Sequence, residues 1–136
     1  MMLALVQVEI IDEISNNLDG ISFNQLVRRM KLKVSRVTLL KELRLLTAKG
    51  YVKVENDPRH KQRKLFRLGE ELHSVIGELR SIEQKMLDNP IHHLSDFLSF
   101  YVEKIRELKD DWMKDFVRHR LRHGLERALR KMEEVV

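Results

Sequence analysis

The residues with the clearest chemical potential are cations that gather between Arg59 and Arg67. This stretch holds five lysines or arginines and one histidine, and it holds no acidic residue. Side chains of like charge at this density favour a polyanionic partner, because an anion relieves their mutual repulsion. Over residues 28–67 the count is 14 Lys or Arg against 3 Asp or Glu, a local charge of +11 in a chain whose net charge is +5.

The residue types that perform catalysis or bind metals do not form a complete set in this sequence. There is no cysteine, which excludes disulfides, thiol redox chemistry and cysteine-ligated zinc. His119 and His123 are one helical turn apart, with Asp115 one turn earlier, but a metal site needs a further ligand from another element. Asp110, Asp111 and Asp115 are interpreted as solubilising charges of an exposed helix. With no phosphate-binding loop or nucleophile motif, we predict that the chain is not an enzyme and binds no metal or cofactor.

The composition indicates one mainly helical domain. The chain has 136 residues, of which 43% are hydrophobic, and its two prolines and five glycines are too few for a fold with many turns. The apolar N-terminal run MMLALVQVEII lacks the basic start of a signal peptide and is followed by an acidic residue. No apolar stretch approaches the ~20 residues that span a bilayer. We expect a cytoplasmic protein without a membrane partner.

Two helices are predicted in the N-terminal part of the chain, before the basic stretch. Apolar residues recur at helical spacing from Leu3 onward, which predicts a first helix that ends near residues 16–17. Ile21 follows in a short extended piece. Ser22 and Gln25 have the spacing of a capping box, in which each side chain satisfies the other residue's backbone N–H, and they predict the start of a second helix.

A third helix is predicted after the turn of residues 30–35. Ser35 is its expected N-cap, and the helix runs to about Lys49, before Gly50 at the position where helices often end in a left-handed residue. Its inward face is predicted to consist of Val37, Leu39, Leu40, Leu43 and Leu46. Its outward face is predicted to carry Ser35, Arg36, Thr38, Lys41, Glu42 and Arg44.

Two strands are predicted next. Residues 51–54 and 64–68 combine β-branched or aromatic residues with polar ones, and a polar turn lies between them around Asp57 and Pro58. The cations therefore occupy a β-hairpin that follows directly on a helix-turn-helix, which is the winged-helix arrangement. We predict a mainly α fold with a small β-hairpin, in which residues 1–69 form a winged helix-turn-helix domain.

The remaining residues, 70–136, are predicted to form C-terminal dimerisation helices. A helix is expected over 70–87, and the sequence Asp88-Asn89-Pro90 ends it. The apolar pattern then continues over 91–132, which predicts one long helix of ~60 Å with a weak point at Gly124. The helix before it is too short to cover this apolar stripe. We therefore expect the 91–132 helix to form a two-fold homodimer.

Double-stranded DNA is the polyanion that this arrangement fits. The helix that begins at Ser35 can lie in a major groove, where its first residues meet base edges, and Arg36 can bind O6 and N7 of guanine. The hairpin can follow the phosphate backbone to the next minor groove, where a narrow groove concentrates negative potential. The predicted DNA-binding residues of the helix are Ser35, Arg36, Thr38, Lys41 and Arg44, and those of the wing are Arg59, His60, Lys61, Arg63 and Lys64.

The stretch VSRVTLLKELRLLTAKGYVKVENDPRHKQRKLFRL resembles the recognition helix, wing and strand of MarR-type winged-helix regulators. TAKGYV matches that family's lysine-glycine and apolar pairs, and NDPRHKQRKLFRL matches its wing in length and charge. The match departs at His60 in place of the wing aspartate, at Lys61 and Gln62 in place of arginines, and at Gly69 in place of threonine. Arg59 or Arg63 is then expected in the minor groove. The C-terminal helices are instead similar to those of PadR-type regulators.

The resemblance implies a dimeric transcription factor, usually a repressor, which a small phenolic or lipophilic effector can release from DNA. We therefore predict a sequence-specific regulator that binds double-stranded DNA as a homodimer on a palindromic operator. Two alternatives use the same basic surface. One is a nonspecific architectural DNA-binding protein without base readout, and the other is a winged-helix module that binds an acidic protein.

Overall fold

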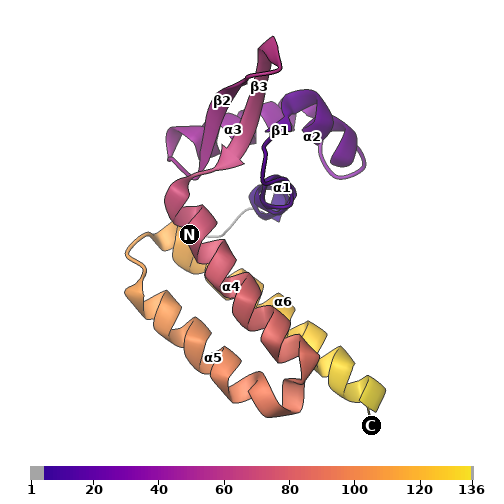
Figure 1. The fold of residues 1–136 in the computed structure, drawn as a ribbon, viewed down its shortest axis with the longest axis vertical. Coiled ribbons are helices and arrows are strands. Elements are labelled where there is room, and N and C mark those ends of the chain that lie inside the picture. Colours follow the sequence, from indigo (N-terminus) through magenta and orange to yellow (C-terminus); the bar gives the residue numbers. More distant parts are fainter. Residues whose placement is uncertain (1–4, 136) are drawn as a thin grey trace. The chain divides into compact units, whose positions relative to one another are not determined.

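The structure is a computed structural model in which residues 5–135 are described. This part of the chain forms six helices and three strands (Figure 1): α1 Leu5–Ser15, β1 Ile21–Ser22, α2 Phe23–Arg29, α3 Arg36–Ala48, β2 Val52–Asp57, β3 His60–Leu68, α4 Glu70–Asp88, α5 Pro90–Glu107 and α6 Asp111–Val135. It divides into two compact units, residues 5–74 and 75–135, which we call the winged unit and the helical unit. The predicted mainly α, winged helix-turn-helix fold is confirmed. None of the described helices has both the length and the apolar character needed to cross a lipid bilayer.

The sheet of the winged unit has three strands, one more than predicted. β3 is the central strand, with β1 and β2 antiparallel on either side of it. Ile21 and Ser22 of β1 pair with Phe66 and Leu65. Two residues are too few to show the alternation that marks a strand in a sequence, so this pairing could not be predicted. β2 and β3 are also longer than predicted and leave only residues 58–59 at the hairpin tip.

Three predicted helix-end signals are confirmed. Ser22 Oγ accepts a hydrogen bond from the backbone N–H of Gln25 at 3.2 Å, and Gln25 Oε1 accepts one from the Ser22 N–H at 3.0 Å. Ser35 Oγ accepts one from the N–H of Thr38 at 3.2 Å at the start of α3. Gly50 follows α3 with a φ of 84°, a conformation that other residues rarely adopt. These local signals fix where α2 begins and where α3 begins and ends.

The inward face of α3 differs from the prediction. Leu39, Leu43 and Leu46 are buried, as predicted, whereas Val37 is 79% exposed and Leu40 is 37% exposed. Successive residues turn about 100° around a helix, so the three buried leucines lie within about 60° of one another, whereas Leu40 and Val37 lie about 60° and about 120° beyond that arc. Both sets follow helical spacing, which is why periodicity alone assigned both to the core. The prediction that Val37 and Leu40 face inward is therefore wrong.

The first helix provides the layer that covers the buried side of α3. α1 contacts α2, α3 and β3, and its buried residues are Val8, Ile10, Ile11, Ile14 and Ser15. Glu42 of α3 was predicted to face outward, but it is half-buried and accepts a hydrogen bond from Gln7 Nε2 of α1 at 2.8 Å. Burial of the isoleucines, at about 1.5–3 kcal/mol for each side chain, is the main force that holds α1 in place.

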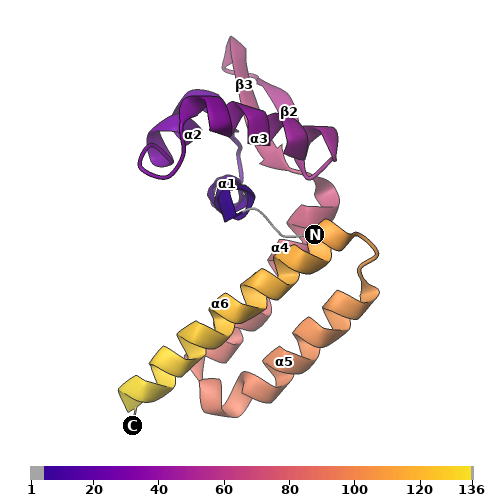
Figure 2. The same cartoon turned by 180° about the vertical axis from the view of Figure 1, so that it is seen from behind.

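The helical unit contains the rest of α4 together with α5 and α6, which run side by side (Figure 2). The single long helix predicted over 91–132 is wrong, because the chain leaves the helical conformation at residues 108–110. Leu108 is extended, with φ −71° and ψ 137°, and Asp110 Oδ1 accepts a hydrogen bond from the N–H of Met113 at 3.0 Å. Asp110, interpreted as a solubilising charge, therefore caps the start of α6.

Close contact between α5 and α6 explains the glycine in the middle of α6. The predicted weak point at Gly124 is not seen, since α6 continues through it as a regular helix. A Cβ atom at this position would lie 2.6 Å from Cζ of Phe97, which is fully buried in α5. Glycine thus lets the two helices approach each other over the Phe97 ring.

A buried polar cluster connects the three helices of this unit. Glu83 of α4 accepts a hydrogen bond from the Tyr101 hydroxyl of α5 through Oε1, and its Oε2 lies 2.8 Å from Arg120 Nη2 of α6. Burial raises the pKa of Tyr101 above its usual value, and the neighbouring Glu83 carboxylate raises it further. The tyrosine therefore remains a hydrogen-bond donor at any physiological pH.

Candidate nucleic-acid interface

The exposed side of α3 combines cations with apolar side chains. Val37, Leu40, Lys41 and Arg44 follow one another at spacings of three, one and three residues, and all four are exposed. These spacings place them on one face of the helix, which we call the outer stripe. Within residues 5–135 neither Lys41 nor Arg44 forms an ion pair. The outer stripe is therefore available to a partner, and its charge favours an anionic one.

Ser35 and Thr38, at the start of α3, are hydrogen-bonded to each other. Ser35 Oγ donates a hydrogen bond to Thr38 Oγ1 at 3.0 Å while it also accepts one from the Thr38 backbone N–H. The hydroxyl proton of Thr38 is not used in this pair and can be donated to a partner. Of these two predicted contact residues, Thr38 keeps the greater capacity for hydrogen bonding.

Arg36 projects from the flank of α3, about 100° around the helix from Val37. Its guanidinium carbon lies 5.1 Å from the centroid of the Phe23 ring, a cation–π contact with α2. It also lines an open hollow of about 460 Å³ together with Arg28 and Arg63, which we call the arginine hollow. Three exposed guanidinium groups around one hollow suit an oxyanion such as a phosphate. Arg28 was not predicted, although it lies on α2 opposite the buried Leu26.

The wing is the β2–β3 hairpin, and its cations lie along the strand β3 as well as at the tip. The predicted wing residues are all exposed, namely Arg59, His60, Lys61, Arg63 and Lys64. Asp57 shapes the tip, because its Oδ1 accepts a hydrogen bond from the Arg59 N–H at 2.9 Å and its Oδ2 lies 3.9 Å from Arg63 Nη1. A second open hollow, of about 510 Å³, is lined by His60 and Lys64 of the wing and by Leu40 of α3. The wing and the outer stripe therefore border the same hollow.

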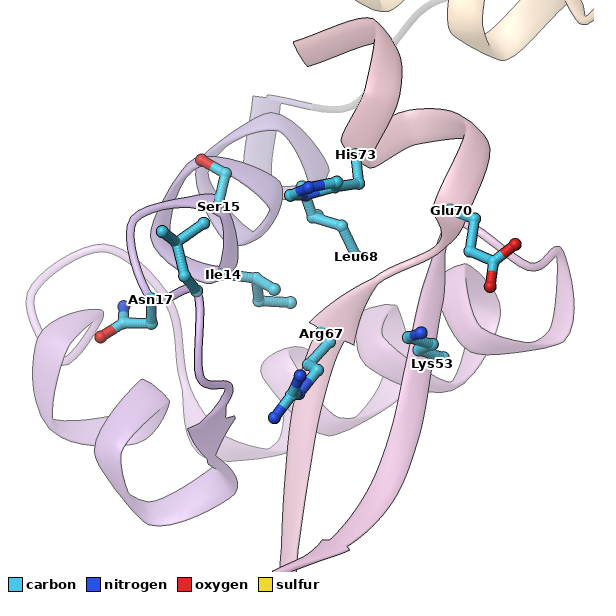
Figure 3. Close-up of a pocket in the computed structure, with 9 residues that line it drawn as sticks. Ile14, Ser15, Asn17, Lys53, Arg67, Leu68, Glu70 and His73 are labelled. Carbon is cyan, nitrogen blue, oxygen red and sulfur yellow. The ribbon is translucent and has the colours of Figure 1, made fainter. Parts of the chain in front are cut away.

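Arg67, the last cation of the basic stretch, has a different role. Arg67 and Lys53 line a separate hollow of about 240 Å³ at the base of the sheet, together with residues of α1 and α4 (Figure 3). Arg67 Nη2 donates a hydrogen bond to the Asp19 carbonyl at 3.0 Å, and its Nε lies 3.1 Å from Glu55 Oε2. The charge of Arg67 is thus compensated within the protein. Its side chain connects β3 to β2 and to the turn before β1, which stabilises the sheet.

His119 and His123, which were considered as metal ligands, contact each other but are not part of a metal-binding cluster among the described residues. The rings of His119 and His123 lie 4.4 Å apart between centroids, and burial, followed by the neighbouring His123, lowers the pKa of His119. Asp115 is paired with Arg118 at 2.9 Å. Along the described part of the chain, no three histidine, aspartate or glutamate side chains are grouped so that they could hold a metal ion.

The fold is similar to solved structures. MepR of S. aureus, in a complex with DNA, matches with a TM-score of 0.52 and 16% identity over 74% of this chain and 80% of MepR. A variant of ZitR from Lactococcus lactis matches with a TM-score of 0.49 and 19% identity over 93% of this chain and 75% of that one. The repressor AdcR of Streptococcus pyogenes has a TM-score of 0.47 and 15% identity over 93% and 81% of the two chains.

The sequence itself matches no family model and no curated protein at a significant level. The likeness to MepR is therefore one of fold. In this chain the fold comprises a helix-turn-helix of α2 and α3, a three-stranded sheet and a wing. This chain has a winged helix-turn-helix fold, which MepR shares.

Proposed function

We propose that this chain is a transcriptional regulator that binds double-stranded DNA in a sequence-specific manner, as a homodimeric repressor on a palindromic operator. α3 lies in a major groove, and the wing follows the backbone to the neighbouring minor groove. The contacts come from Ser35, Arg36, Thr38, Lys41 and Arg44 of the helix and from Arg59, His60, Lys61, Arg63 and Lys64 of the wing. We also propose that a small-molecule effector binds the regulator and releases it from the DNA.

The observation that carries this proposal is the basic surface of the winged unit. Its cations are exposed, and those at 28, 41, 44, 59, 61 and 64 form no ion pair with any residue in 5–135. Uncompensated cations cost stability through mutual repulsion, so this surface is explained by a polyanion that binds it. The solved structure of MepR, which has the same fold, contains DNA.

The homodimer is supported by an apolar ridge on α5. Ile91, Leu98 and Val102 are exposed large hydrophobic residues at spacings of seven and four, so they form one line along the helix. A ridge of this kind is the usual seam between two packed helices. A two-fold dimer would present two α3 helices to half-sites about one turn of DNA apart, ~34–36 Å.

The proposal is tested by selection from a pool of random-sequence DNA duplexes with the purified full chain. Retained duplexes are sequenced, and the affinity for the selected duplex and for random duplex is measured by fluorescence anisotropy. We expect a palindromic motif bound at least 10³-fold more tightly than random DNA, the lower end for specific regulators.

Two other outcomes select the alternative functions. Equal affinity for all duplexes, with a steep dependence on salt, identifies a nonspecific architectural protein. Failure to retain any duplex at low salt contradicts DNA binding and favours a winged-helix module whose partner is an acidic protein.

A further inference from the structure

We infer that Val37, with Leu40 beside it, forms a contact for the C5-methyl group of thymine. This inference rests on the proposed function, because it requires α3 in a major groove. It adds a recognition element that differs from the hydrogen-bonding and charged residues discussed above. Its ligand is an apolar group on a base, and its consequence is a preference for thymine at a defined position of the operator.

The position of Val37 is not explained by the stability of the chain. Its side chain is 79% exposed, so folding removes little of its apolar surface from water. A β-branched residue also favours a helix less than alanine, lysine or glutamate would. A single exposed valine is common on protein surfaces and needs no explanation by itself. Here it is joined by the exposed Leu40 one turn along, on the face that carries Lys41 and Arg44.

The surroundings of this apolar pair identify DNA as its occupant. Lys41 and Arg44 flank it on the outer stripe, and His60 and Lys64 of the wing line the hollow that Leu40 borders. A protein partner that buried the pair would have to compensate these cations, whereas a duplex presents phosphates on both sides of the groove. The cations and the apolar pair are thus complementary to a groove with charged walls and a base at its floor.

The major groove offers one apolar group that such a pair can recognise. Thymine alone among the four bases carries a methyl group on its major-groove edge, and small apolar side chains contact it. Val37 is the second residue of α3, in the first turn, which is the part of a recognition helix that meets base edges. Its methyl groups can therefore exclude water from a thymine methyl while the cations hold the backbone.

The experiment replaces thymine by deoxyuridine, which removes only the methyl group. A duplex is first selected from the random pool with the full chain, and each thymine is then replaced in turn. The affinity of each duplex is measured by anisotropy for the wild-type chain and for Val37→Ala. We expect one position in each half-site at which deoxyuridine weakens wild-type binding about fourfold, the effect of one methyl group no longer buried. Val37→Ala should bind the two duplexes equally.

Leu129→Ala is the matched control, since Leu129 is also an exposed helical leucine but belongs to α6 of the helical unit. It should retain the fourfold ratio. A chain that selects a motif yet is indifferent to every replacement refutes the Val37 assignment alone. A Val37→Ala variant that keeps the wild-type ratio of affinities for the thymine and deoxyuridine duplexes also refutes it. If that variant in addition sediments with a lower mass than the wild-type chain, Val37 and Leu40 contact a protein instead. A chain that retains no duplex refutes the proposed function and this inference together.

Discussion

At the scale of single residues, Arg36 has two chemically distinct ways to contact DNA. Arginine in the first turn of a recognition helix can bind O6 and N7 of guanine, and the sequence predicts this role. Its position beside Arg28 and Arg63 in the arginine hollow would equally suit a backbone phosphate. The two roles differ in consequence, because only a contact to a base distinguishes one sequence from another.

Arg36→Ala is expected to reduce the discrimination between selected and random duplex by about 1–3 kcal/mol through loss of the guanine contact. The measurement is the ratio of the two dissociation constants by anisotropy. Arg29→Ala is the control, because Arg29 has the same charge but is paired with Glu13 at 3.7 Å. An equal loss of affinity for both duplexes would instead place Arg36 on a phosphate.

Which site residues could be predicted depended on how local their signals are. The N-cap role of Ser35 and the exposed cations from Arg59 to Lys64 could be predicted because capping and charge are properties of a short stretch. Val37 and Leu40 were assigned to the core, since a helix with two overlapping apolar stripes does not reveal which of them α1 will cover. Arg28 was missed because nothing in the sequence shows that it meets Arg36 and Arg63 around one hollow.

At the scale of elements, two glycines with different surroundings make a matched test of the helical unit. Gly124→Ala would place a Cβ 2.6 Å from the buried Phe97 ring, whereas an alanine at Gly77 of α4 would meet no atom within 4 Å. We expect Gly124→Ala to cost about 1–3 kcal/mol through overpacking, more than the gain in helix propensity. Gly77→Ala should stabilise by about 0.5–1 kcal/mol. Urea unfolding measures both, and a stabilising Gly124→Ala would contradict the close helix contact.

The break between α5 and α6 shows where prediction of elements from periodicity fails. Apolar residues keep helical spacing through Ile105, Leu108 and Trp112, so the pattern continues although the helix does not. The signal for the break was Asp110, whose carboxylate caps α6. By contrast, the break at residues 88–90 contains a proline and was predicted correctly, because proline cannot continue a helix.

At the scale of the whole molecule, the central question is whether two copies of this chain act together. Sedimentation equilibrium at micromolar concentration should give twice the chain mass of 16.3 kDa. The double variant Leu98→Glu, Val102→Glu places charges on the apolar ridge of α5 and should sediment as a monomer. Leu45→Glu, an equivalent change at an exposed leucine of α3, should remain a dimer. A wild-type monomer at high concentration would contradict the dimer, and a dimeric double variant would place its interface elsewhere.

The proposed function depends most on contact between the basic surface of the winged unit and a DNA backbone. The most direct measurement is the salt dependence of affinity for a random-sequence duplex, compared between the wild type and the double variant Lys61→Ala, Arg63→Ala. Each lost phosphate contact should lower the slope of log K against log salt by about 0.9, with weaker binding to every sequence. Lys85→Ala, which removes an exposed cation of α4, should leave the slope unchanged. An unchanged slope in the wing variant would show that the wing does not contact the duplex, which would contradict the proposed mode of DNA binding.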